Sequence, residues 1–170
     1  MFGSGERGSL GRRIIESLKT LEADFINHED GFSIAAFARG GLFLASYIYY
    51  HFYKNCREFY VIKLRRADGE KEEYDYSIKP KIDFTDFDFS ILKEKRILLV
   101  DDIFASGETI ALAENYLRDH SEGLKKIDRN YEELKIVKAA LVVNKKLISG
   151  GIYWGDICED RDWIEFAWEK

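Results

Sequence analysis

The sequence predicts one doubly wound α/β domain, in which helices cover both faces of a parallel sheet. Four apolar runs are long enough to be strands, and segments with helical spacing lie between them. Continuous aliphatic runs, as opposed to alternating ones, are typical of strands buried on both faces. Because strands alternate with helices and no internal repeat is present, a single doubly wound sheet accounts for the pattern. The strands are expected at residues 33–37, 59–64, 97–100 and 136–143.

Composition narrows the class of protein. The chain has 170 residues, of which 46% are hydrophobic and 34% charged, as expected of a globular domain with a sizeable core. Its net charge of −5 argues against a general nucleic-acid partner. Cys56 and Cys158 lack CxxC spacing and no signal peptide is recognisable, so we expect free thiols and a cytoplasmic protein. The apolar run 41–53 is too short to cross a bilayer, so no membrane partner is expected.

The N-terminal segment divides into a tail and a first helix. Residues 1–11 are glycine-rich and lack apolar periodicity, which predicts a flexible tail. Residues 12–170 then form the single domain. One amphipathic helix is expected to end near Asn27, and its apolar positions are Ile14, Leu18, Leu21 and Phe25.

The next helix is expected at residues 42–54, after the first strand and a tight turn at 38–41. Nearly every side chain in it is apolar or aromatic. A helix that is apolar all round is usually buried on more than one side. We therefore expect it to pack on the sheet and against a second subunit, in a homodimer or a larger homo-oligomer.

Two polar segments interrupt the alternation of strands and helices. Residues 65–80 are charged and end at Pro80, which predicts a flexible lid or an irregular hairpin. Residues 121–135 form a charged insert, after a helix that we expect to end near His120. The chain then continues through the last long strand to an aromatic C-terminal segment.

The third strand leads into the segment with the strongest chemical signal. Asp101 and Asp102 follow the strand directly, where its end would hold them in a crevice. A turn of small and hydroxylated residues then opens a helix. Backbone N–H groups at such a helix N-terminus bind anions, and a glycine lets the ligand approach the backbone. The absence of lysine after Gly107 excludes a P-loop. The residues of this turn are Ala105, Ser106, Gly107, Glu108 and Thr109.

Three more residues have the chemistry of a binding site, each with a structural alternative. Arg39, in the turn after the first strand, could hold an anion through two N–H bonds or be an exposed arginine of a structural turn. Lys145, just past the last long strand, could donate to a ligand carbonyl, with a solvated lysine and Lys146 as the alternatives. Trp163 could stack on a flat heterocycle or cap the hydrophobic core.

Residues 97–109 resemble the 5-phosphoribosyl-1-pyrophosphate (PRPP) motif of type I phosphoribosyltransferases. That motif has four apolar residues, two acids, two apolar residues, a variable residue, Thr or Ser, Gly, a variable residue and Thr, and every fixed position is met. The turn 38–41 is similar to the family's pyrophosphate loop. Residues 163–169 resemble the C-terminal ending of xanthine-guanine and related purine phosphoribosyltransferases, with Ala167 in place of proline. The resemblance implies the type I fold, a central parallel sheet flanked by helices with a small C-terminal hood and a flexible lid.

The resemblance also implies how PRPP would be bound. Asp101 and Asp102 would hold the ribose hydroxyls, and their charge would favour a cationic ribose in the transition state. Residues 105–109 would cradle the 5′-phosphate. Arg39 and Gly40 would bind the pyrophosphate, and Arg39 would stabilise it as it leaves. Asp101, Asp102 and Arg39 are thus the expected catalytic residues.

A cofactor and a base site follow from the same resemblance. Mg²⁺ is the expected cofactor, with Asp102 and Glu169 as its protein ligands. The base would contact Lys145 through its carbonyl oxygen, stack on Trp163 and be read by the backbone carbonyl of Ile164. These contacts would hold the base in the orientation for attack on the ribose.

The implied function is a Mg-dependent purine phosphoribosyltransferase of purine salvage. It would join guanine, xanthine or hypoxanthine to PRPP, giving a nucleoside monophosphate and pyrophosphate. Ala105 stands where 6-oxopurine enzymes of this family mostly have aspartate and adenine enzymes have alanine, so an adenine enzyme is the first alternative. The second is a non-catalytic PRPP-sensing regulator of the same fold, although neither a helix-turn-helix nor a basic patch is visible.

Overall fold

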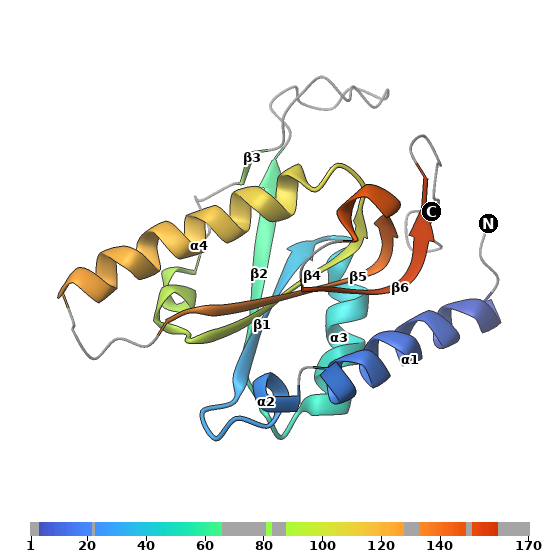
Figure 1. Cartoon of the computed structure of the whole chain (residues 1–170), viewed down its shortest axis with the longest axis horizontal. Helices are drawn as coiled ribbons and strands as arrows, with labels where there is room; N and C mark the ends of the chain where they lie inside the picture. The colour runs from blue at the N-terminus through green and yellow to red at the C-terminus, as the bar shows by residue number, and fades with distance from the viewer. Residues whose placement is uncertain are drawn as a thin grey trace.

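A six-stranded sheet with strand order β3-β2-β1-β4-β5-β6 forms the centre of the computed structural model (Figure 1). The structure describes residues 4–21, 23–65, 81–82, 88–127, 133–148 and 151–159. Five strands are mutually parallel: β1 (Phe32–Ala38), β2 (Cys56–Arg65), β4 (Arg96–Phe104), β5 (Lys135–Asn144) and β6 (Ile152–Cys158). The short β3 (Lys81–Ile82) pairs antiparallel with β2. The predicted parallel α/β sheet is confirmed, while the lid segment 66–80 and the C-terminal segment 160–170 lie outside the described residues.

Helices cover both faces of this sheet (Figure 1). One face carries α1 (Ser4–Leu21), α2 (Ala23–Ile26) and α3 (Gly41–Phe52). The other carries α4 (Glu108–Ile127) and a short 3₁₀ helix, η1 (Phe89–Lys93). A second 3₁₀ helix, η2 (Lys145–Leu147), follows β5. None of the helices within the described ranges is both long and apolar enough to cross a membrane.

The strands are continuously apolar because successive side chains enter two different cores. In β4, Leu98 and Val100 pack in the core beneath α3, where Ile48 is also fully buried. Ile97 and Leu99 pack in the core beneath α4. Successive side chains of a strand point to opposite faces, so a strand buried on both faces is apolar at nearly every position.

The connections reverse direction between β1 and β4. From β1 the chain passes through α3 to β2 on one side, and from β4 it passes through α4 to β5 on the other. β1 pairs with β4 only as far as Ala36 and Val100, whereas β4 stays paired with β5 up to Phe104 and Val143. A crevice at such a switch point, outside the carboxyl ends of the strands, is where ligands bind in open α/β sheets.

Three helix boundaries differ from the sequence predictions. Helix α1 begins at Ser4, inside the predicted 1–11 tail. The single N-terminal helix predicted to reach Asn27 is instead the pair α1 and α2, and Phe25 of α2 still reaches the core.

The third difference is at the end of α4, which continues to Ile127 through the first half of the predicted insert 121–135. Ser121 is buried and Leu124 is partly buried, so both extend the covered stripe begun by Ala113 and Leu117. Because Ser121 is polar and its neighbours are charged, the apolar periodicity did not indicate that the helix continues past His120.

Candidate active site at the carboxyl ends of β1 and β4

The acidic pair lies within a strand and not after one. The sequence prediction ended the strand at residue 100, but β4 continues to Phe104 because β5 continues to pair with it. On its other side, β4 has no β1 partner beyond Val100. Asp101 and Asp102 therefore lie in the part of β4 that extends beyond its pairing with β1, at the switch point of the sheet.

The turn after β1 lies directly against the acidic pair. A Cβ atom built on Gly40 would overlap the carboxylate of Asp102, and one built on Gly41 would overlap the backbone carbonyl of Val100. Only glycine allows this close approach of the turn to β4. The peptide bond between Ala38 and Arg39 is cis, and the Arg39 side chain is exposed. The structure thus brings together the arginine-glycine turn and the carboxylates predicted to share one ligand.

The electrostatics of the pair favour a cationic ligand. Asp102 is buried and Asp101 partly buried, and the backbone N–H of Asp102 donates to Oδ1 of Asp101 at 2.9 Å. Burial raises the pKa of Asp101 well above its ordinary value, and repulsion from Asp102 raises it further. A positive charge placed beside the pair would favour the ionised form of both carboxylates.

The predicted anion-binding turn follows β4. Ala105 and Ser106 are exposed, and Gly107 has a φ of 78°, which favours glycine. The hydroxyl of Ser106 accepts a hydrogen bond from the Glu108 N–H at 3.3 Å, and α4 begins at Glu108. Thr109 is partly buried in the first helical turn. The turn therefore opens a helix of 20 residues, whose N-terminal N–H groups suit an anion.

Leu147 contacts this turn, although nothing in the sequence pattern predicts that it takes part. A Cβ built on Gly107 would lie 2.9 Å from Cδ2 of Leu147. Leu147 belongs to η2, the short helix that also carries Lys145. The segment after β5 therefore supports the segment after β4, a relationship set by the pairing of the two strands and not by either local sequence.

Lys145 occupies the predicted place just past β5. The side chain of Asn144 accepts a hydrogen bond from the Lys146 N–H at 3.0 Å and so caps η2. The Nζ of Lys145 lies 3.8 Å from Oε1 of Glu159, and both side chains are exposed. Such an exposed pair is weak and leaves the ammonium group able to change partner. Trp163, Ile164 and Glu169 lie outside the described residues.

The carboxylates fit a magnesium ion that also binds the substrate. Mg²⁺ usually takes one or two protein carboxylates and fills its other positions with water and substrate phosphates. Asp101 and Asp102 supply hard oxygen donors of this kind at the crevice. Within the ranges that the structure describes, no group of three or more His, Cys, Asp or Glu side chains gathers. Two neighbouring carboxylates match the number that Mg²⁺ usually takes from a protein when it also binds a phosphorylated ligand.

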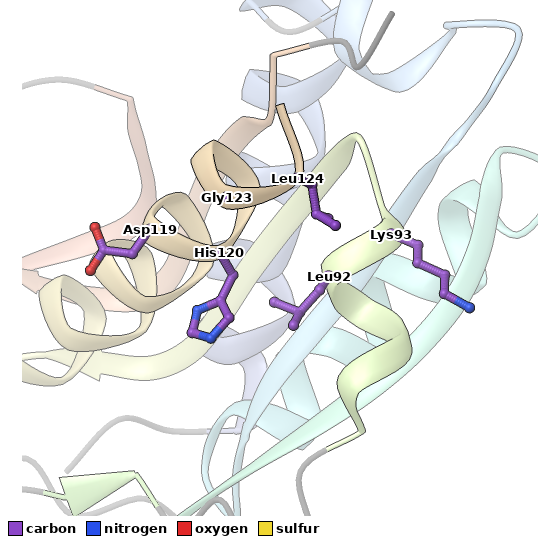
Figure 2. Close-up of a pocket in the computed structure, with 6 residues that line it drawn as sticks. All are labelled: Leu92, Lys93, Asp119, His120, Gly123 and Leu124. Atoms are coloured by element: carbon purple, nitrogen blue, oxygen red, sulfur yellow. The ribbon is translucent and has the colours of Figure 1, made fainter. Parts of the chain in front are cut away.

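A separate pocket of about 440 Å³ lies between η1 and α4 (Figure 2). Two of its lining residues belong to η1, and the other four lie in the C-terminal half of α4, the helix that begins at Glu108. At 1.5 Å per residue, they lie roughly 17–24 Å along the axis from Glu108. The pocket is therefore remote from the acidic pair. It is lined by Leu92, Lys93, Asp119, His120, Gly123 and Leu124.

Comparison with known proteins identifies the relatives of this chain. A family model for the phosphoribosyl transferase domain matches residues 11–169. Among solved structures, a purine phosphoribosyltransferase from Pyrococcus horikoshii is 20% identical, with a TM-score of 0.59 and coverage of 99% of this chain and 92% of that one. A hypoxanthine-guanine phosphoribosyltransferase from Bacillus anthracis is 17% identical, with a TM-score of 0.61 and coverage of 93% and 80%.

A third solved structure, a xanthine-guanine-hypoxanthine phosphoribosyltransferase from Helicobacter pylori, is 19% identical, with a TM-score of 0.53 and coverage of 94% of this chain and 84% of that one. No curated protein sequence matches significantly. At these identities, the solved structures establish a common fold. The shared architecture includes the sheet that carries the acidic pair.

Proposed function

Because this chain belongs to the phosphoribosyltransferase family, we propose that it transfers the 5-phosphoribosyl group of PRPP to a 6-oxopurine base. The products are a nucleoside monophosphate and pyrophosphate. The observation that carries the proposal is the contact of the Gly40 turn with the Asp102 carboxylate. It joins an anion-binding turn to an acidic pair at the switch point, and PRPP needs both.

PRPP has three parts that match three parts of this site. The 5′-phosphate binds the turn 105–109, where backbone N–H groups open α4. The ribose hydroxyls donate hydrogen bonds to Asp101 and Asp102. The pyrophosphate lies over the glycine turn, with the exposed guanidinium of Arg39 donating to it.

The reaction breaks the bond between C1 of the ribose and the pyrophosphate oxygen, and the ribose becomes cationic in the transition state. Asp101 and Asp102 stabilise this charge. Burial and mutual repulsion destabilise the two carboxylates, as the raised pKa of Asp101 indicates, so a positive charge beside them is favoured. Arg39 stabilises the leaving pyrophosphate. Asp102 and Glu169, together with the substrate, would hold Mg²⁺, which would supply positive charge to neutralise the phosphates.

The base is held on the other side of the ribose. Lys145, at the end of β5, donates to the carbonyl oxygen of the base after leaving Glu159. Trp163 stacks on the ring, and the backbone carbonyl of Ile164 accepts from its edge. Together they orient N9 toward C1, which lowers the entropic part of the barrier.

The names of structurally similar proteins support a purine substrate, since they include purine, hypoxanthine-guanine and xanthine-guanine-hypoxanthine phosphoribosyltransferases. Ala105, however, supplies no carboxylate beside the ring, and this favours adenine as the second candidate. An adenine enzyme would use the same PRPP site and differ only in its contacts to the base.

The test is a panel of guanine, hypoxanthine, xanthine and adenine, each incubated with PRPP and Mg²⁺. Pyrophosphate release and nucleotide formation are both measured, and Asp101→Asn/Asp102→Asn protein serves as the control. We expect product from at least one 6-oxopurine and none from the control. Product from adenine alone would establish the second candidate, and no product from any base would contradict an enzymatic role.

Trp163→Ala should raise the KM for the base more than that for PRPP.

A further inference from the structure

Asn144 is a buried polar residue at the end of an apolar strand. It is the last residue of β5, and residues 139–143, directly before it, are apolar and buried. Only four polar or charged residues in the described part of the chain are buried, and another of them is Asp102 of the acidic pair. Burying an amide costs free energy unless it is hydrogen-bonded. The hydrogen bonds of Asn144 therefore account for its presence better than packing does.

The side chain of Asn144 fixes the short helix η2. Its Oδ1 accepts a hydrogen bond from the Lys146 N–H at 3.0 Å, which satisfies a backbone donor at the start of the helix. At the other end, the Ile148 N–H donates to the carbonyl of Lys145 at 3.5 Å. Short 3₁₀ helices have poor internal hydrogen-bond geometry. The shape of η2 therefore depends on this cap.

Helix η2 reaches two parts of the candidate site. The Nζ of Lys145 lies 3.8 Å from Oε1 of Glu159, beyond the end of β6. Leu147 packs on the turn after β4, because a Cβ built on Gly107 would lie 2.9 Å from its Cδ2. Lys145 and Leu147 belong to the same helical turn. A change in the backbone of η2 therefore moves both.

The strand ladder holds Asn144 itself in place. Asn144 lies opposite Cys158 in β6, and its neighbour Val143 lies opposite Phe104 in β4. The main chain of Asn144 is thus part of the sheet, while its side chain bonds to the helix that follows. Asn144 is the point at which the rigid sheet sets the position of η2.

We propose that Asn144 is a positioning residue, which holds the base-binding lysine and the phosphate-binding turn at a fixed separation through η2. The inference rests on the proposed function, in which Lys145 binds the base and the turn 105–109 binds the 5′-phosphate. These two groups lie at opposite ends of the nucleotide, so both subsites must be placed correctly at once. A misplacement of about 1 Å can lower the rate about 10²-fold.

The test measures binding at both subsites. The KM values for PRPP and for the base that reacts fastest come from steady-state kinetics, and the Kd of PRPP without base comes from calorimetry. We expect Asn144→Ala to raise all three about fivefold, the equilibrium effect of losing one helix cap. Asn144→Asp keeps an accepting oxygen and should retain values near wild type. Asn144→Leu keeps the side-chain volume without an acceptor, and should behave like Asn144→Ala.

The matched control is Asp88→Ala, which removes the same kind of bond from the other 3₁₀ helix. The side chain of Asp88 caps η1 by accepting from the Ser90 N–H at 2.9 Å, before β4 begins. Its loss should leave the Kd and both KM values unchanged. Thermal melting reports the stability of every variant.

Three results would overturn the proposal: Asn144→Ala lowers only the melting temperature, it raises only one of the two KM values, or Asn144→Asp behaves like Asn144→Ala. A wild-type chain that binds PRPP and converts no base would contradict the proposed transferase function. The Kd of PRPP in Asn144→Ala would then decide whether Asn144 supports the phosphate-binding turn, and an unchanged Kd would overturn that role as well.

Discussion

Gly40 lies against the carboxylate of Asp102, close enough that a methyl group on Gly40 would overlap the carboxylate atoms. The two residues are far apart in sequence and belong to the carboxyl ends of neighbouring strands. Their contact makes the turn after β1 and the acidic pair of β4 one structural unit. A group that binds the turn therefore also meets the acids, and several consequences of this arrangement can be measured.

Gly40→Ala should reduce kcat/KM by about 10²-fold, because the added methyl displaces the turn or Asp102 by a substantial part of an ångström. The neighbouring Gly41→Ala should also destabilise the fold, since its methyl meets the rigid backbone of Val100. Gly123→Ala on α4 is the control, because nothing lies within 4 Å of its added Cβ. Steady-state kinetics and thermal melting separate the three. Wild-type kinetics in Gly40→Ala would contradict the conclusion that the turn after β1 and the acidic pair act together.

Asp101→Asn should make the protein more stable at neutral pH and cut turnover by about 10²–10³. Burial and the charge of Asp102 raise the pKa of Asp101 above its ordinary 3.8, so an ionised Asp101 destabilises the folded state. The amide oxygen still accepts the hydrogen bond from the Asp102 N–H.

The pH dependence of this stabilisation has a definite sign. Below pH 3.8, Asp101 is protonated in both folded and unfolded chains, so the two proteins should be equally stable. The wild-type chain loses stability relative to the variant as the pH rises from there through the raised folded pKa. Chemical unfolding at several pH values measures the difference. A variant less stable than wild type at pH 7 would argue against a strained acidic pair.

Leu147→Ala should raise the KM for PRPP more than that for the base. The side chain contacts Gly107, so its loss lets the turn 105–109 relax away from the 5′-phosphate. Leu147→Met, which keeps the volume, should restore most of the affinity. If Leu147 only filled the core, both variants would change the melting temperature and leave the two KM values in the same ratio.

Glu114→Gln should lower the free energy of unfolding by about 1.5–3 kcal/mol, the range for hydrogen bonds to charged groups. Glu114 of α4 accepts from Lys138 of β5 at 2.9 Å and from Arg118 at 2.8 Å. The control is Arg118→Gln, which removes the more exposed partner and should cost about 0.3–0.5 kcal/mol.

This effect should weaken in acid. Burial raises the pKa of Glu114, but the hydrogen bonds from Lys138 and Arg118 outweigh it, and the pKa is lowered overall from 4.5. The ion pair therefore stabilises the fold above that pH and loses its effect as the pH falls through the lowered folded pKa. Urea unfolding at pH 7 and pH 3 measures this, and an equal difference at both would contradict it.

Ala105→Asp should speed the reaction with guanine and hypoxanthine. Attack by N9 requires a purine proton to move, and alanine neither accepts nor donates one. General acid–base catalysis is typically worth about 10²–10⁴ in rate. Single-turnover rates with each base are the measurement, and adenine is the internal control. A rate on both 6-oxopurines that stays flat or falls would favour adenine as the substrate, or another acid already serving the base.

The sequence by itself determined the parallel sheet and the residues that form the acidic motif. The run at 97–100 is typical of a strand buried on both faces, and Asp101 and Asp102 follow it directly in the sequence. Periodicity was less reliable at the ends of elements. It ended α4 near His120, although Ser121 and Leu124 continue the covered stripe and the helix extends to Ile127.

Only the tertiary structure decided which of these segments touch. Gly40 meets Asp102 because β1 lies beside β4, and Leu147 meets Gly107 because β5 lies on the other side. The order of strands in a sheet depends on how the connecting segments of the whole chain pack together. It therefore cannot be predicted from the local sequence of any one strand. The extension of β4 past Asp102 has the same cause, since a strand continues for as long as a neighbouring strand offers hydrogen bonds.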